Sequence, residues 1–178
     1  FTPDGPREFD SHTETINVKD EAPETLEIRS TIWGPVIDED HLGRPRAFRW
    51  IAHDAGSVNL SVLDLEHVVT VADAQEVANR SGLPPQNFVC VDEAGSVGWT
   101  IAGRIPRRIG FSGETPVSWA DGQHRWDGWL EPGEYPRIVD PEEGLIWTAN
   151  ARVVGGQDLE LIGDGGYALG ARAGQIRD

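Results

Sequence analysis

The sequence has no methionine and a single cysteine, Cys90, among its 178 residues. One cysteine excludes an internal disulfide, although it does not identify the compartment, because secreted bacterial enzymes often lack disulfides. Every apolar run is far shorter than the ~20 residues that cross a bilayer, so we expect no membrane span. The chain starts at Phe1 with neither an initiator methionine nor a signal sequence, so we expect it to be part of a longer protein.

Basic residues are also scarce. The chain has 15 Lys and Arg against 30 Asp and Glu, which gives a formal net charge of −15. Such a chain cannot neutralise phosphates, so nucleic acid is excluded as a partner. The length suits one domain, and 7 tryptophans with 38% hydrophobic residues can form a core. The 21 glycines and 12 prolines favour short strands and tight turns, so the predicted fold class is a strand-rich α+β.

Alternating apolar and polar residues predict the N-terminal strands. Residues 1–13 are polar and are expected to be loose. The strands are expected at 15–19, 25–29, 31–33 and 47–53, with Gly34-Pro35 ending the third. Two apolar stretches, 60–65 and 67–71, have an ambiguous period.

The second half of the chain gives the strongest predictions. Thr70 is positioned to cap a helix over 71–80, and Gly82 to stop it. Two strands at 87–92 and 96–102 flank Glu93-Ala94-Gly95 and predict a hairpin. Residues 103–117 resemble a loop, and helix-forming residues occupy 168–178. Two further strands are expected at 144–154, buried, and at 158–162.

No motif of a common catalytic or metal site is present. The five histidines have no ligand spacing, and one cysteine cannot build a zinc site. The acidic turn at 38–40 lacks the distal ligands of a calcium loop, and the glycines of 163–166 lack the Lys-Ser/Thr of a phosphate loop. No G-x-S-x-G elbow occurs, and Cys90 is expected to be inert core.

Asn150 and Arg172 remain as candidates. Asn150 ends the apolar stretch that follows Gly144, and a polar amide there is placed like a functional group. Taken alone, Asn150 is a hydrogen-bonding residue at a strand end, and Arg172 is a surface residue of a helix.

Seven short motifs, in order along the chain, resemble landmarks of the penicillin acylase (penicillin amidase) family. Each motif alone is weak, but the ordered series covers the chain from about residue 16 to the C-terminus. Thr31–Val36 and Ala47–Trp50 are similar to its T-x-H-G-P-V and A-L-x-W motifs, with Trp33 in place of the usual histidine. The other matching segments are Pro85–Asn87, Asp92–Gly98, Gly103–Arg107, Trp126–Leu130 and Pro141–Asn150.

The resemblance implies an N-terminal-nucleophile hydrolase with an αββα sandwich of antiparallel sheets. Such enzymes are precursors that cut themselves into two chains, and the new N-terminal serine attacks an amide carbonyl with its own α-amino group as base. A backbone N–H and an asparagine amide then hold the oxyanion. Asn150 matches that asparagine, and Arg172 resembles an arginine that orients the N-terminal site.

The resemblance also implies what lies outside these residues. Phe1 has no hydroxyl or thiol and cannot be the nucleophile, so we expect 1–178 to be an internal segment of the β chain, inactive by itself. Its partners would be the α chain, the preceding part of the β chain and a small acyl amide, such as a β-lactam or an acyl-homoserine lactone. The family implies export to the periplasm or beyond, and a structural calcium in some members.

A second hypothesis is a non-catalytic binding or scaffold domain that retains the fold. Trp119, Trp126 and Trp129 would then form a recognition surface. The alternative for these residues is packing.

Overall fold

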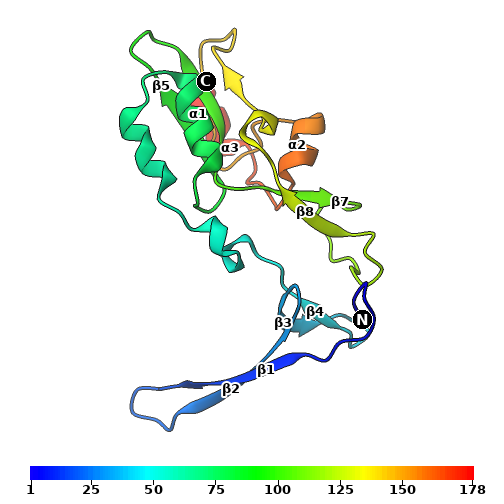
Figure 1. Ribbon diagram of the computed structural model, residues 1–178. Coiled ribbons are helices and arrows are strands. Elements are labelled where there is room, and N and C mark those ends of the chain that lie inside the picture. The colour runs from blue at the N-terminus through cyan, green and yellow to red at the C-terminus, as the bar shows by residue number, and fades with distance from the viewer.

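The computed structural model describes residues 1–178, and a three-stranded antiparallel sheet in the order β5-β6-β9 lies in the upper part of the molecule in Figure 1. Its strands are β5 (Gln86–Val91), β6 (Val97–Ala102) and β9 (Ile138–Val139). The first two form the predicted hairpin, with Val89 opposite Trp99. The hairpin prediction is therefore confirmed.

Helix α1 (Val71–Arg80) covers one face of this sheet and has the predicted bounds. The Thr70 hydroxyl caps it by accepting a hydrogen bond from the Asp73 N–H at 3.2 Å. Gln75 is fully buried and donates from Nε2 to the carbonyls of Trp99 (3.1 Å) and Ile138 (3.3 Å). One side chain thus ties the helix to two strands.

Asn79 forms a second tie between α1 and β6. Its Nδ2 donates to Thr100 Oγ1 (3.0 Å) and to the Ile101 carbonyl (2.8 Å), and its Oδ1 accepts from Arg137 (3.0 Å). Thr100 Oγ1 in turn donates to the Pro136 carbonyl at 2.9 Å. Helix, sheet and the segment before β9 therefore share one buried polar network.

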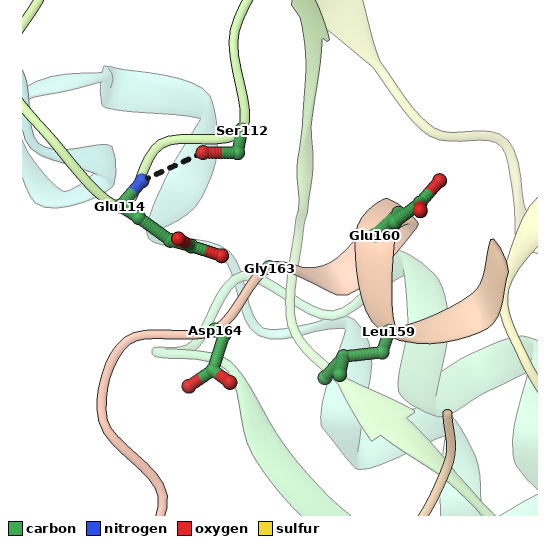
Figure 2. A pocket seen from close by; sticks show the side chains of 6 residues that line it. All are labelled: Ser112, Glu114, Leu159, Glu160, Gly163 and Asp164. Carbon is green, nitrogen blue, oxygen red and sulfur yellow. Dashed lines mark hydrogen bonds between the residues drawn. The ribbon is translucent and has the colours of Figure 1, made fainter. Parts of the chain in front are cut away.

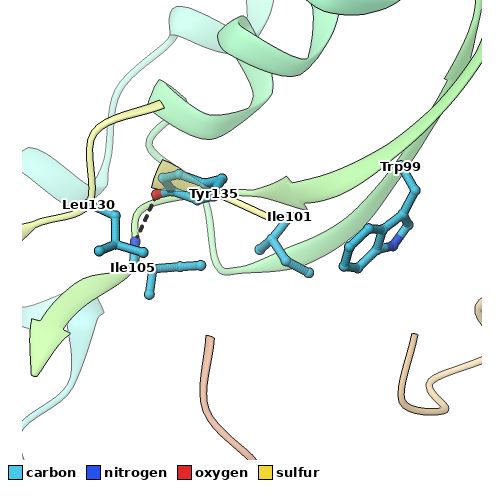
Figure 3. Packing of buried hydrophobic residues seen from close by; sticks show 5 residues of the cluster. All are labelled: Trp99, Ile101, Ile105, Leu130 and Tyr135. Carbon is cyan, nitrogen blue, oxygen red and sulfur yellow. Dashed lines mark hydrogen bonds between the residues drawn. The ribbon is translucent and has the colours of Figure 1, made fainter. Parts of the chain in front are cut away.

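The hydrophobic core lies on the opposite face of the sheet (Figure 3). Its five buried residues are Trp99, Ile101, Ile105, Leu130 and Tyr135. The Tyr135 hydroxyl is satisfied there, because it donates to the Gly103 carbonyl (2.9 Å) and accepts from the Ile105 N–H (3.0 Å). Ile138 of β9 packs against this cluster, and so does the C-terminal segment, through Ile146, Val153, Val154, Leu161 and Ile162.

A two-stranded ribbon leaves the core and reaches towards the N-terminus (Figure 1). It consists of β7 (Pro106–Ile109) and β8 (Arg125–Trp129). The expectation of a loop over 103–117 is wrong for β7, because this strand has too few residues for its alternation to be visible. The 3-10 turn Pro132–Glu134 follows β8.

The N-terminal residues form an antiparallel sheet that projects from the rest of the molecule (Figure 1). Its order is β1-β2-β3-β4, with bounds Asp10–Ile16, Glu24–Thr31, Gly34–Glu39 and Pro45–Ala47. The ladder between β1 and β2 starts at Asp10, so residues 10–13 are not loose as predicted. Gly34 begins a strand instead of ending one. The predicted strand at 47–53 is largely wrong, because β4 ends at Ala47.

Short 3-10 segments connect this projecting sheet to α1, at Ile51–His53, Ala55–Ser57 and Ser61–His67. The last of them contains most of the first apolar stretch of ambiguous period, at 60–65. A second connection is aromatic. Trp33, in the turn between β2 and β3, meets Trp119 at 6.1 Å between ring centroids.

The C-terminal residues are helical and irregular, and both strands predicted there are wrong. Residues 158–162 belong to α2 (Gly156–Ile162), and the last two residues of this helix, Leu161 and Ile162, pack against the core. Residues 144–154 form no strand, because Ala149 and Asn150 have positive φ angles that a strand cannot accommodate. The last helix, α3 (Ala171–Arg177), lies within the predicted helical stretch.

The fold class is α+β with antiparallel sheets, as expected. No helix has both the length and the apolar composition needed to cross a bilayer.

Replacement of Asn79 by alanine removes three hydrogen bonds from a site where the side chain is only 2% exposed. Because the Ile101 carbonyl then stays buried and unpaired, we expect Asn79→Ala to lower the free energy of unfolding by about 2–4 kcal/mol in urea denaturation. Glu76→Ala, on the exposed side of α1, is the control and should change it by less than ~0.5 kcal/mol. Equal effects would contradict the assignment.

Glu134 should show a pH-dependent contribution to stability. Hydrogen bonds from Arg107 (2.8 and 2.6 Å), and then from the Glu131 N–H, lower the pKa of Glu134 from 4.5 to about 2. Because this pKa is lower in the folded state, the stabilisation is present above pH 4.5 and is lost as the pH falls to about 2. An NMR titration of the Glu134 carboxyl should show the low midpoint, and Arg107→Gln should raise it. An unchanged midpoint in that variant would refute the cause given.

Candidate functional site

Asn150 lies in a tight turn and not at the end of a strand. The Ala151 N–H donates to the Thr148 carbonyl at 3.1 Å, and the two residues between them, Ala149 and Asn150, have φ angles of 55° and 61°. Positive φ at both central positions is the signature of a type I′ turn. Asparagine tolerates this conformation, whereas an alanine costs about 1–2 kcal/mol there. Strain of this kind is concentrated at functional sites.

Arg172 contacts this turn directly from the first turn of α3. Its Nη2 donates to Asn150 Oδ1 at 2.9 Å and to the Ala149 carbonyl at 3.0 Å. A guanidinium carries donors only, so the oxygen of the Asn150 amide faces Arg172 and its nitrogen points elsewhere. The structure therefore brings together the two candidate residues, which are distant in sequence.

The Asn150 amide nitrogen is available to a ligand. Nδ2 makes no hydrogen bond within the chain, and the residue is exposed. Arg172 binds the oxygen of this amide, so the two N–H groups of Nδ2 face outward. Such N–H donors are suited to bind a negatively charged oxygen of a ligand. The arrangement can therefore stabilise an oxyanion.

A backbone hydrogen bond fixes the turn from a second direction. The Ala168 N–H donates to the Asn150 carbonyl at 2.9 Å. Residues 151–167 thus form a loop that contains α2 and whose two ends meet at Asn150. We call this loop the excursion. Sequence reasoning missed Ala149 and Ala168, because both act through backbone atoms and their side chains give no signal.

The other side chains considered from the sequence form no reactive cluster. The structure has no group of three or more His, Cys, Asp or Glu placed to hold a metal ion. Burial, followed by the charge of Asp92, raises the pKa of the half-buried Cys90 thiol, so it stays protonated at neutral pH. His53 and His124 lie edge-on against Phe48 and Phe111.

The tryptophans pack on one another. Trp119 meets Trp126 at 6.3 Å, and Trp126 meets Trp129 at 6.1 Å, with all three half-buried. The Arg104 guanidinium lies 4.1 Å from the Trp129 ring centroid. These contacts favour the packing interpretation over a recognition surface.

Two pockets of the chain have linings that do not include Asn150. The one in Figure 2 has a volume of about 80 Å³. Its lining residues are Ser112, Glu114, Leu159, Glu160, Gly163 and Asp164. Three carboxylates and a single hydrophobic residue make it unsuited to an acyl chain.

Known proteins resemble this chain over most of its length. The chain is 36% identical over 141 residues to "Penicillin acylase 2 proenzyme" of Pseudomonas sp. (strain SE83), covering 78% of this chain and 18% of that protein. It is 30% identical over 155 residues to "Acyl-homoserine lactone acylase QuiP" of Pseudomonas aeruginosa, covering 79% and 18%. The chain therefore spans less than a fifth of these relatives.

A solved structure shows the same fold. The thermostable penicillin G acylase from Alcaligenes faecalis superposes with a TM-score of 0.71 and 20% identity, covering 90% of this chain and 29% of that one. The family model described as Penicillin amidase matches residues 1–178. The chain belongs to the penicillin amidase family.

Proposed function

We propose that this chain is the oxyanion-stabilising part of an amide hydrolase that removes an acyl group from a small amide. Family membership supports the reaction class, and the relatives' names suggest β-lactams or acyl-homoserine lactones as substrates. The observation that carries the proposal is the bond from Arg172 to Asn150 Oδ1, which leaves Nδ2 free to donate.

In this mechanism, a nucleophile adds to the amide carbonyl and the carbonyl oxygen becomes negatively charged. Asn150 Nδ2 donates to that oxygen, and the hydrogen bond strengthens as the charge develops. Arg172 holds the amide and polarises it through Oδ1, which makes Nδ2 a better donor. Because the turn is already formed, the amide needs no reorganisation during the reaction.

The nucleophile lies outside this chain in our proposal. A serine at the N-terminus of the processed β chain would attack, with its α-amino group as base. One relative is named a proenzyme, which fits processing of a precursor. We accordingly propose that residues 1–178 depend on the rest of the precursor for activity, and that the protein acts in the periplasm or outside the cell.

Loss of the Asn150 amide should slow turnover and leave substrate binding nearly unchanged. Removal of one oxyanion donor typically lowers kcat by about 10²–10³. We expect Asn150→Ala in the full-length, processed enzyme to show that loss, with KM changed by less than about threefold. Steady-state kinetics on acyl amides would measure both constants.

Gel analysis of the processed chains is the necessary control, because a variant that fails to mature would also lose activity. A matured Asn150→Ala enzyme with unchanged kcat would remove Asn150 from the oxyanion site.

Arg172 should act through Asn150. Arg172→Ala releases both Oδ1 and the Ala149 carbonyl, so we expect kcat to fall by about 10- to 100-fold through misplacement of the amide. Arg172→Lys retains one donor and should lose less. Arg177→Ala, in the same helix, removes only the exposed pair with Asp178 and is the matched control. Equal kcat for Arg172→Ala and Arg177→Ala would refute this role.

A further inference from the structure

We propose that Arg108 is a positioning residue for Asn150. It acts by anchoring the excursion, residues 151–167, to strand β7. This inference rests on the proposed function, because it assigns Arg108 to the same oxyanion site. Arg108 touches neither Asn150 nor Arg172, and its effect passes through α2 and the residues that follow this helix.

The guanidinium of Arg108 binds the C-terminal end of α2. Its Nη2 donates to the carbonyls of Leu161 (2.7 Å) and Glu160 (3.1 Å). The last carbonyls of a helix have no partner within the helix, and they carry the negative end of its dipole. A cation is therefore suited to hold this end of the helix in place.

Arg108 has no carboxylate partner, although the chain is rich in acids. Burial lowers the pKa of its guanidinium, but an arginine remains charged at neutral pH. The hydrogen bonds of the Arg108 guanidinium go to the carbonyls of Glu160 and Leu161 alone, so this side chain is held at the C-terminal end of α2. Its contacts therefore determine where α2 ends relative to β7.

Glycines make the space for this side chain on two sides. A Cβ at Gly163 would lie 3.1 Å from Arg108 Nη2, and a Cβ at Gly113 would lie 3.2 Å from Arg108 Cδ. Both glycines have positive φ, at 89° and 95°. Figure 2 shows the two segments facing each other, with Ser112 and Glu114 across from Gly163. The backbone on each side is thus shaped around Arg108.

A short series of contacts leads from this anchor to Asn150. Gly163, which follows α2, accepts a hydrogen bond on its carbonyl from the Tyr167 hydroxyl at 3.2 Å. Ala168, which follows Tyr167, donates from its N–H to the Asn150 carbonyl at 2.9 Å. An ion pair between Arg152 and Asp164 closes the same excursion from the other side. Movement of the end of α2 would therefore be transmitted to the turn that carries Asn150.

Arg107 provides a matched control within the same strand. It is the neighbour of Arg108, it is half-buried too, and it pairs with Glu134 at 2.6 Å instead of binding α2. Substitution of Arg107 removes the same charge from the same strand but leaves the excursion intact. A difference between the two variants isolates the contact with α2 from the loss of charge.

The test is a double-mutant cycle in the full-length, processed enzyme, with kcat and KM measured for Arg108→Gln, Asn150→Ala and the double variant. We expect Arg108→Gln to lower kcat by about tenfold, with KM within about twofold, and Arg107→Gln to leave both unchanged. Because Arg108 acts through Asn150, Arg108→Gln should lower kcat no further once Asn150 is alanine. A purely structural role would instead lower the kcat of both backgrounds equally.

A second variant covers the case in which Arg108→Gln does not fold. Tyr167→Phe removes only the hydroxyl that binds Gly163, and it should give the same non-additive pattern with a loss of about threefold or more. Hydrogen exchange at the Ala168 amide, which needs no activity, should speed up in Arg108→Gln or Tyr167→Phe and stay unchanged in Arg107→Gln.

The outcomes separate the two proposals. If Asn150→Ala lowers kcat but Arg108→Gln or Tyr167→Phe does not, or if their effects simply add, the role of Arg108 is refuted and the proposed function stands. If Asn150→Ala has the kcat of the unmodified enzyme, the proposed function fails, and the role of Arg108 in that site fails with it.

Discussion

The hydrogen bond between Arg172 Nη2 and Asn150 Oδ1 is the interaction on which the candidate site depends. Arginine has donors only, so this bond determines which end of the Asn150 amide faces outward. The same nitrogen binds the Ala149 carbonyl, and the Ala168 N–H binds the Asn150 carbonyl. Ala149 has a strained, positive φ in this turn. Three hydrogen bonds, all donated by residues 168–172, hold the turn in place. The strain and the contacts that oppose it are consistent with an amide held ready to donate.

The rest of the fold supports that segment. Trp99 and Ile101 of β6 form the core surface on which Ile146, Leu161 and Ile162 pack. On the other face, α1 is tied to the same strand by buried amides, those of Gln75 and Asn79. The Asn79 amide has partners on both its nitrogen and its oxygen, and a buried polar group that is satisfied in this way specifies one arrangement of the elements it joins. The sheet therefore provides a rigid base for a C-terminal segment that has little regular structure of its own.

The sequence predicted the elements with strong local signals. Thr70 located the start of α1, and Glu93-Ala94-Gly95 located the hairpin, because caps and turns act within a few residues. It failed at 158–162, where D-L-E-L-I alternates like a strand yet also has the i, i+3 spacing of a helix. It failed again at 144–154, where an apolar run packs against the core without any strand pairing. Both failures arise because tertiary contacts decide the structure of short apolar segments.

The candidate residues Asn150 and Arg172 were accessible from the sequence through a family resemblance, whereas their contact was not, because it joins two segments that only the fold brings together. The central claim is that Asn150 Nδ2 is a donor to the reacting oxygen. A crystal structure of the processed, full-length enzyme with a boronic acid bound to its nucleophile would test this directly, since the tetrahedral adduct mimics the charged intermediate. We predict that Asn150 Nδ2 lies about 2.7–3.1 Å from one boronate oxygen, with Arg172 still on Oδ1. A boronate oxygen held by other donors, with Asn150 turned away, would contradict the account.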